Sequence, residues 1–391
     1  MPLAQQSLAR VFQMECARRW FSICISLWIL LTASGISADA GTFYRVSGGP
    51  NKMLAADLNH DGMLDVIGAG AGGLNVLLNK GDGTLLPAVT YPDNNGYFLA
   101  TADFNNDGNL DVVTEDAATG GNIDTLLGNG DGTFQAAKTL HSNCGIDPAG
   151  ITTGDFNGDG KADLAVGNFG PRKLAILLGK GDGTFLLGSC NVVKVGEIIA
   201  TDINHDGKID LVAVNSDRQI APYGLLSILG NGDGSFQDTL QYDNKALLTS
   251  PELADINSDG ALDVLAMSAP QFVPMSVLTF LGRGDGTFQK PSTIASTKDF
   301  VEAFTVANFD GDGFPDVMIE TLKDTLMFSV TFFAGNGDGT YRKGTALPIP
   351  SHAPTLIGAD LDSDGKTDLI GTLPNSSQIV VFHGNGDGTF Q

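Results

Sequence analysis

The chain has 391 residues, of which 51 are glycine, and it carries a formal net charge of −23 at pH 7. Such a negative charge excludes a nucleic-acid-binding protein, because nucleic-acid phosphates require a basic surface. A hydrophobic content of 42% together with abundant glycine is typical of a turn-rich globular protein and not of a disordered chain.

The first 40 residues are predicted to be a secretory signal peptide. Arg18 and Arg19 precede the apolar run WFSICISLWILLTA, and Ala38-Asp39-Ala40 has the small-x-small pattern of a cleavage site. The apolar run is shorter than the roughly 20 residues of a membrane-spanning helix, although an uncleaved anchor is the alternative. Residues 18–21 also resemble a twin-arginine signal. We expect a mature chain of residues 41–391 that has no membrane span and is secreted, periplasmic or bound at the cell surface.

Two of the four cysteines, Cys144 and Cys190, lie outside this predicted signal. An even number of cysteines in an exported chain permits one disulfide, and two buried free thiols are the alternative.

From residue 57 onward, one acidic loop sequence occurs seven times in the chain. The copies begin at Asp57, Asp103, Asp155, Asp202, Asp255, Asn308 and Asp360. A second string, Gly-Asp-Gly followed by Thr or Ser, comes after each loop and begins at Gly81, Gly130, Gly181, Gly232, Gly284, Gly337 and Gly386. A repeat of about 50 residues is typical of a propeller, a solenoid or an array.

Short apolar runs surround each loop and predict strands. In the third copy these runs are residues 150–154, 163–166 and 174–178, and a fourth run follows the Gly-Asp-Gly string. Runs of four to six β-favouring residues between Gly/Asn/Asp clusters are strand signals. Four antiparallel strands in each of seven units predict an all-β fold, a seven-bladed β-propeller over residues 41–391.

The two ends of this ring are predicted to meet in one blade. The chain finishes with Gly388-Thr389-Phe390-Gln391, where the fourth strand of the last unit is still to come. The segment 42–46 resembles the missing strand. We expect it to pair with the third strand of the last blade and to cover an exposed sheet edge.

Within each loop, oxygen-bearing side chains occupy positions 1, 3, 5 and 9, and glycine occupies position 6. Together with the backbone carbonyl of position 7, they would form an oxygen cage without His or Cys. Such a cage suits Ca²⁺ better than Mg²⁺, which keeps more of its waters. The predicted ligands are Asp57, Asn59, Asp61, Asp65, Asp103, Asn105, Asp107, Asp111, Asp155, Asn157, Asp159, Asp163, Asp202, Asn204, Asp206, Asp210, Asp255, Asn257, Asp259, Asp263, Asn308, Asp310, Asp312, Asp316, Asp360, Asp362, Asp364 and Asp368.

Two alternatives to this calcium hypothesis can be weighed from the sequence. An EF-hand needs an acidic residue at position 12, but that position holds Gly, Thr, Val, Ala, Ala, Ile and Gly in the seven copies. A set of Asx-turns is the second alternative, and its recurrence in seven copies disfavours it. Six loops carry three carboxylates and the seventh carries four, so the loops account for nearly all of the net charge. The acidity therefore indicates up to seven Ca²⁺ ions and says little about a basic partner.

The Gly-Asp-Gly strings are predicted to be structural hairpin turns, because glycine permits positive φ and the aspartate can cap the turn. The residue after the following Thr or Ser is usually Phe, and we expect it to pack between neighbouring sheets.

These two strings, as in Asp155-Phe156-Asn157-Gly158-Asp159-Gly160 and Gly181-Asp182-Gly183-Thr184-Phe185, resemble those of FG-GAP/VCBS repeat proteins. The propellers of that family are similar to the integrin α-subunit head. The resemblance covers residues 41–391. It implies calcium in each loop between the first two strands of a blade, and a role in adhesion or recognition outside the cytoplasm. The further domains of an integrin are missing, so integrin-like adhesion itself is not implied.

The sequence favours a recognition module over an enzyme. The motifs G-x-S-x-G, H-E-x-x-H and the P-loop are absent, and the five histidines lie in different units. We expect a monomer whose loops bind an unidentified protein or polysaccharide. A lectin that stacks sugars on Tyr91, Tyr97, Tyr223 or Tyr242 is one alternative, and a structural spacer in a cell-surface assembly is another.

Overall fold

The structure is a computed structural model that describes residues 41–92, 96–116, 122–140, 144, 148–168, 173–191, 193, 195–215, 224–243, 247–268, 276–296, 300–323, 327–349 and 351–391. The predicted signal peptide lies outside these residues and stays a prediction. In the part of the chain that the structure describes, no helix has the length and apolar character needed to cross a membrane.

The regular secondary structure of the described chain consists of short strands and one 3₁₀ turn. They are β1 Thr42–Arg45, β2 Pro50–Ala56, β3 Asp65–Gly70, β4 Gly73–Leu77, β5 Val89–Tyr91, β6 Leu99–Ala102, β7 Asp111–Asp116, β8 Asn122–Leu126, β9 Lys138–Leu140, β10 Pro148–Gly154, β11 Asp163–Asn168, β12 Leu174–Gly179, β13 Phe185–Asn191, β14 Ile198–Thr201, β15 Asp210–Asn215, β16 Gly224–Ile228, β17 Leu240–Asp243, β18 Leu248–Ala254, β19 Asp263–Ser268, β20 Ser276–Phe280, β21 Ser292–Ser296, β22 Phe300–Ala307, β23 Asp316–Lys323, β24 Met327–Gly335, β25 Tyr341–Ile349, β26 Leu356–Ala359, β27 Asp368–Leu373 and β28 Gln378–Phe382. A 3₁₀ turn, η2, covers Pro374–Ser376.

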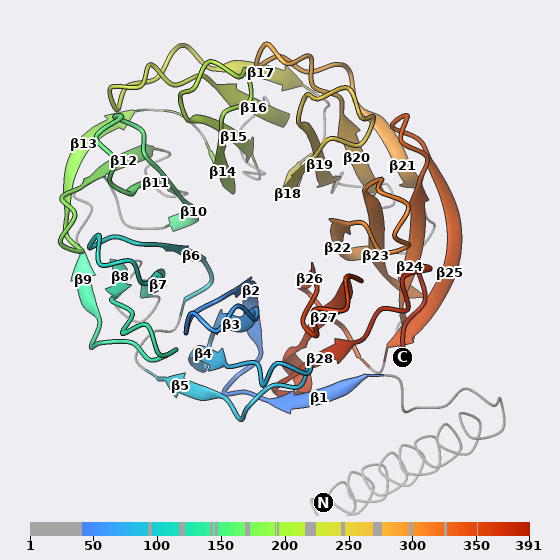
Figure 1. Ribbon diagram of the computed structural model, residues 1–391. Helices are drawn as coiled ribbons and strands as arrows, with labels where there is room; N and C mark the ends of the chain where they lie inside the picture. The colour runs from blue at the N-terminus through green and yellow to red at the C-terminus, as the bar shows by residue number, and fades with distance from the viewer. Residues whose placement is uncertain are drawn as a thin grey trace, which may run out of the picture. The chain divides into compact units, whose positions relative to one another are not determined.

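These strands form seven four-stranded antiparallel sheets arranged in a ring (Figure 1). In the first six blades the strands follow chain order, from β2–β5 in blade 1 to β22–β25 in blade 6. The first strand of each blade lies nearest the centre of the ring, and the fourth lies at its rim. The predicted seven-bladed propeller is confirmed.

The core lies between neighbouring blades. The second strands β3, β11 and β27 are buried along their whole length, because adjacent sheets cover both of their faces. One core cluster, for example, joins Phe104 and Val113 of blade 2 to Leu164 and Leu177 of blade 3. Sheets are therefore stabilised by burial against their neighbours, through separate apolar clusters that each lie between two adjacent blades.

The last blade combines both ends of the described chain, as predicted. β1 pairs antiparallel with β28, so that Thr42 lies opposite Val381, and the sheet order is β1-β28-β27-β26. The Tyr44 hydroxyl of β1 accepts a hydrogen bond from the backbone N–H of Leu85 in blade 1, at 3.1 Å. The first strand therefore completes the last sheet and also contacts the next blade.

A disulfide joins Cys144 to Cys190, whose Cα atoms are 5.8 Å apart. Cys144 precedes β10, the innermost strand of blade 3, and Cys190 lies in β13, the outermost strand of the same blade. Of the two alternatives that the sequence left open, the structure has the disulfide.

Candidate metal centres

Each of the seven acidic loops joins the first strand of a blade to the second. The burial of its side chains depends on position alone. Positions 1 and 3 are half-buried, position 5 is exposed and position 9 is buried, and this holds in all seven copies. The 28 predicted ligands therefore lie in equivalent places, at the end of each blade that also carries the Gly-Asp-Gly turn.

Two residues of each loop adopt a left-handed backbone conformation. The glycine at position 6 has positive φ throughout. Position 4 also has positive φ, between 57° and 76°, in His60, Asn106, Gly158, His205, Ser258, Gly311 and Ser363. These two bends turn the backbone so that the side chains of positions 1, 3 and 5 lie on the inside of the turn.

Hydrogen bonds within the loop orient these inner side chains. In the third loop, Asp155 accepts bonds from the N–H groups of Asp159 and Gly160, at 3.1 and 2.8 Å. Asn157 accepts from Asp159 at 2.9 Å, and Asp159 accepts from Lys161 at 3.0 Å. This is the Asx-turn geometry of the alternative reading, and it leaves further lone pairs on each carboxylate available to a cation.

The aspartate at position 9 connects the loop to the rest of its blade. Asp163 Oδ2 accepts a hydrogen bond from the N–H of Phe156 at position 2, at 3.0 Å. Its Oδ1 accepts one from the N–H of Gly179, the last residue of β12, at 2.7 Å. The same pair of bonds recurs in every loop, with the second donor being Asn79, Gly128, Gly179, Gly230, Gly282, Gly335 or Gly384.

The buried position 9 carboxyls are held in an unfavourable electrostatic environment. Burial raises their pKa values, to about 6 for Asp263 and Asp316, although the two backbone hydrogen bonds oppose this shift. The carboxylates at positions 1 and 5 raise the pKa of Asp263 further. A cation between these groups would remove the repulsion.

Carboxylate oxygens converge most closely in the loops with an acid at position 3. Among the described residues, ligand atoms of Asp310, Asp312 and Asp316 lie within 4.8 Å of one another. So do those of Asp360, Asp362 and Asp364. Oxygen donors alone, with several negative charges, match the ligand preference of Ca²⁺, so the residues present fit the predicted ion.

The Gly-Asp-Gly turns are structural, as expected. Asp182 Oδ1 accepts hydrogen bonds from both the N–H and the hydroxyl of Thr184, at 2.9 and 2.5 Å. These bonds, the hydroxyl one first, lower the pKa of Asp182. Each of the other six turns has the same pair of bonds.

The second glycine of this turn also contacts the acidic loop of the preceding blade. Gly183 in blade 3 donates its N–H to the carbonyl of Phe104 in blade 2, at 3.0 Å. Equivalent bonds join Gly132 to Leu58, Gly234 to Phe156, Gly339 to Ile256 and Gly388 to Phe309. The backbone of these five acidic loops is therefore hydrogen-bonded directly to the neighbouring blade.

A family model described as an FG-GAP-like repeat matches residues 57–114, 117–166 and 202–266. Together the matches contain the acidic loops of blades 1 to 5. Three segments of this chain therefore match the FG-GAP-like repeat. The FG-GAP propeller fold suggests a binding or recognition module.

Solved structures with the same fold have dissimilar sequences. A lectin of Agrocybe aegerita that recognises non-reducing terminal N-acetylglucosamine has a TM-score of 0.54 and 20% identity, over 78% of this chain and 81% of the lectin. A putative 6-phosphogluconolactonase from Bacteroides uniformis has a TM-score of 0.54 and 14% identity, over 87% and 94% of the two chains. A protein from Lactobacillus plantarum has a TM-score of 0.57 and 12% identity, over 90% and 95%. At these identities, the likeness establishes the fold alone. No curated protein matches the chain.

One constant feature of these FG-GAP-like repeats was missed by the sequence reasoning. Position 2 of the loop is always a large apolar residue, and its side chain is buried. Phe104 packs edge-on against Phe185 of the next blade, and Phe156 does so against Phe236, with ring centroids 5.4 and 5.7 Å apart. The signal was present in the sequence, because position 2 reads Leu, Phe, Phe, Ile, Ile, Phe and Leu in the seven copies.

The aromatic residues considered for sugar stacking have other surroundings. Tyr91 and Tyr242 pack edge-on against Phe134 and Phe288 of the following blades. The Tyr91 hydroxyl accepts the N–H of Phe134 at 2.9 Å, so both tyrosines belong to blade junctions. Tyr97 is 51% exposed, and Tyr223 lies outside the described residues.

Two of the histidines, His60 and His205, lie at position 4 of their loops and are exposed. Both contact the loop of the next blade. His60 Nε2 lies 3.1 Å from Asn109 Oδ1, and His205 Nε2 lies 3.2 Å from the Gly260 carbonyl oxygen.

A pocket of about 260 Å³ lies where the first strands of several blades begin. Its lining includes Lys52, Glu197 and Glu252 together with Tyr97 and Phe304. Glu197 accepts the N–H of Ser250 at 2.9 Å and Glu252 accepts that of Val306 at 2.8 Å, so both carboxylates join the inner strands of neighbouring blades.

Proposed function

We propose that the protein is an exported, non-catalytic recognition module that binds calcium and uses its propeller loops to bind a protein or a surface polymer. One observation carries the calcium part of this proposal. Seven equivalent loops each gather carboxylate and amide oxygens on the inside of one turn, and in the last loop the carboxylates of Asp360, Asp362 and Asp364 lie within 4.8 Å of one another.

The charge balance of the loops supports a bound cation. Basic partners within the loops are the lysines at position 7, which form ion pairs with the position 5 aspartates at 3.2, 3.7 and 2.6 Å in the third, fourth and seventh loops. These pairs are about one-third exposed, and such surface pairs contribute little. Three or four carboxylates per loop against at most one lysine leave an excess of negative charge that a divalent ion would neutralise.

The side chains at positions 1, 3, 5 and 9 would hold the ion. When bound, Ca²⁺ supplies charge neutralisation and fixes the loop. Since position 2 bonds to the next blade's Gly-Asp-Gly turn, a fixed loop would also fix the blade junction. The loops would then present a rigid face, which favours recognition because less conformational entropy is lost on binding.

The Cys144–Cys190 disulfide supports export, because disulfides persist in oxidising compartments outside the cytoplasm. The conclusion agrees with the predicted signal peptide in residues 1–40, which the structure does not describe.

Titration calorimetry on the mature chain tests calcium binding. We expect uptake of several Ca²⁺ ions at millimolar concentration and a lower melting temperature in EGTA. Each site contributes about 2.7 kcal/mol at a hundredfold excess over Kd. A melting curve that does not change between calcium and EGTA, with no heat of binding, would refute the calcium part of the proposal.

The ligand is tested separately, by capture from native envelope material in calcium and in EGTA. We expect a protein or polymer that is retained only in calcium. A glycan array run under the same two conditions separates the lectin from the protein-binding module, since defined calcium-dependent sugar hits favour the lectin. Equal capture in calcium and EGTA would contradict recognition through the calcium loops.

A further inference from the structure

Blade 7 differs from the other six blades at two positions that face each other. In each blade, the backbone N–H that donates to the second oxygen of the position 9 aspartate lies near the end of the third strand. The residue immediately before this donor is His383 in blade 7, whereas in blades 1 to 6 it is Leu78, Leu127, Leu178, Leu229, Leu281 and Ala334. Position 3 of the loop is Asn in five blades and Asp in blades 6 and 7. Blade 7 alone combines the histidine with the acid, Asp362.

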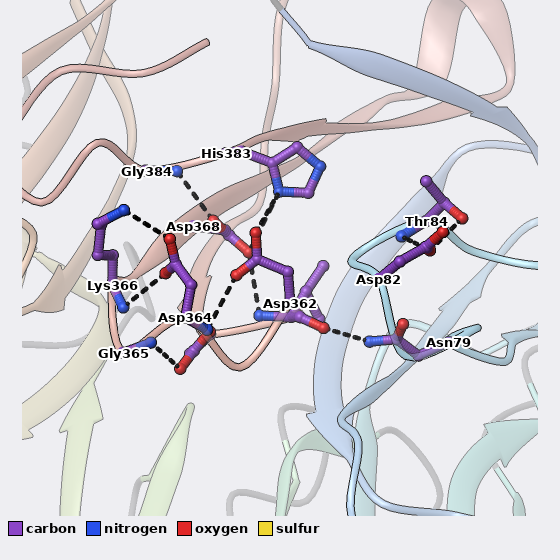
Figure 2. A network of polar contacts seen from close by, with 12 residues as sticks. Asn79, Asp82, Thr84, Asp362, Asp364, Gly365, Lys366, Asp368, His383 and Gly384 are labelled. Carbon is purple, nitrogen blue, oxygen red and sulfur yellow. Dashed lines mark hydrogen bonds and ion pairs between the residues drawn. The ribbon is translucent and has the colours of Figure 1, made fainter.

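The histidine occupies a tightly enclosed place. In blades 1 to 5 the leucine packs beneath the second glycine of the next blade's turn, as Leu127 does beneath Gly183. His383 lies beneath Gly83 of blade 1 in the same way. A Cβ atom on Gly83 would lie 2.6 Å from His383 Cε1 and 2.9 Å from Asp362 Cβ. The imidazole is therefore held next to the carboxylates by the blade junction (Figure 2).

The imidazole directs a buried nitrogen toward two carboxylates without a hydrogen bond to either. His383 Nδ1 is inaccessible to solvent and has no hydrogen-bond partner, whereas the side chain as a whole is 21% exposed. It lies 3.5 Å from Asp368 Oδ2 and 3.8 Å from Asp362 Oδ2 (Figure 2). Hydrogen bonds to oxygen are shorter, at about 2.7–3.2 Å.

The 3.5 Å separation from Asp368 Oδ2 falls within the range for two ligands of one metal ion, and the 3.8 Å separation from Asp362 Oδ2 lies slightly above it. Two ligands about 2.0–2.2 Å from a tetrahedral Zn²⁺ ion lie roughly 3.3–3.6 Å apart. Ligand atoms of Asp362, Asp368 and His383 all lie within 4.8 Å of one another. Imidazole nitrogen suits Zn²⁺ and other first-row transition metals, whereas Ca²⁺ takes oxygen ligands.

We infer that Asp362, Asp368 and His383 form a binding site for a borderline transition-metal dication such as Zn²⁺. The site shares Asp362 and Asp368 with the predicted calcium ligands of the seventh loop, and His383 is the ligand that it adds. It deepens the proposed metal-binding function because it lies in the same loop, but it does not require calcium to be bound. The ion would connect the seventh loop to the end of β28, beside the junction with blade 1, where Asn79 donates to the Leu361 carbonyl at 2.6 Å.

Titration of the calcium-free mature chain with Zn²⁺ tests this site, with His383→Leu as the matched variant, because calcium would compete for Asp362 and Asp368. Leucine is the residue that five other blades carry at this position, so the variant is expected to fold, and circular dichroism checks this. We expect one Zn²⁺ ion to bind to the wild type and its affinity to fall by at least about tenfold in His383→Leu. Asp362→Asn, which restores the residue of five other loops, should weaken Zn²⁺ binding as well.

Co²⁺ provides a second readout, because its visible absorption reports nitrogen and carboxylate ligation. We expect a Co²⁺ spectrum from the wild type that His383→Leu abolishes. Zn²⁺ binding that is absent from the wild type, or equal in the wild type and His383→Leu, would overturn the inference. Calcium titration without zinc decides the proposed function independently. His383→Leu should leave the number of bound Ca²⁺ ions unchanged.

Discussion

At the scale of single residues, the aspartates of one loop have different tasks. Asp163 at position 9 is buried and accepts two backbone hydrogen bonds, one from the loop and one from the end of β12. Asp159 at position 5 is exposed and accepts bonds from neighbours in the loop. The sequence pattern treats them alike as ligands, but only position 9 also holds the blade together.

This difference predicts distinct effects of alanine at the two positions. Asp163→Ala leaves two buried N–H groups unpaired, at about 1–3 kcal/mol each, so it should destabilise the protein by at least about 2 kcal/mol in both calcium and EGTA. Asp159→Ala should lower stability in calcium and have little effect in EGTA. Urea unfolding in both conditions measures these changes. Equal losses for the two variants in EGTA would show that position 9 has no structural task of its own.

At the scale of the elements, the blade is a strand–loop–strand unit whose connections reach into its neighbour. In five of the seven loops the position 2 carbonyl accepts the N–H of the next blade's second glycine, as Phe104 does from Gly183. The position 2 side chain packs against the next blade's Phe, as Phe104 does against Phe185. Each acidic loop therefore forms one side of a blade junction. In the last blade, β1 supplies the fourth strand.

Deleting residues 41–47 tests the contribution of β1. The deletion exposes the edge of β28 and removes the contact of Tyr44 with Leu85, so the melting temperature should fall by at least about 5 °C. Tyr44→Phe is the control, since it removes only the hydroxyl and should cost no more than about 1.5 kcal/mol. Differential scanning calorimetry gives both values, and an unchanged melting temperature in the deletion would exclude closure by β1.

The sequence predicted those parts of the fold that are local and repeated. The alternation of turn strings and apolar runs predicted the positions of the strands, and the number of repeats predicted the number of blades. The pairing of segment 42–46 was predictable because both ends of the chain resembled parts of one unit. The hydrogen-bond partners of the position 9 aspartates could not be predicted, because Asp163 and Gly179 come into contact only when the hairpin has folded.

The seventh loop shows the same limit at the candidate site. The sequence placed Asp362 and Asp368 in one loop, but His383 directly follows β28, the strand that pairs with β27, and its Nδ1 faces both carboxylates. A comparison of equivalent positions, with leucine in five blades and histidine in the last, was the available signal.

At the scale of the whole molecule, the ring depends on contacts between the inner strands as well as on the loops. Glu252 in β18 accepts the N–H of Val306 in β22 at 2.8 Å and lines the pocket at the start of the inner strands. Burial raises the pKa of Glu252 from its ordinary 4.5 to about 8, against the opposing effect of the Val306 hydrogen bond and of Lys52.

This shift predicts that stability falls as the pH rises. Between pH 4.5 and about 8, the folded protein keeps the Glu252 proton and the unfolded chain has lost it. The folded state then holds more protons, so the free energy of unfolding decreases with pH, by at most about 1.4 kcal/mol per unit. Glu252→Gln, which stays neutral, should remove this slope. Urea unfolding at pH 5.5 and 7.5 in saturating calcium measures it, and equal slopes in both proteins would contradict the assignment.

The pairing of β1 with β28 has a consequence for how the protein is made. All strands of the first six sheets lie between β1 and its partner β28 in the chain, so the seventh sheet can close only after the strands of the other six have been synthesised. Any product released early would keep an open seam with an unpaired strand at each side. Such truncated chains would expose unpaired strand edges and would therefore be prone to aggregate.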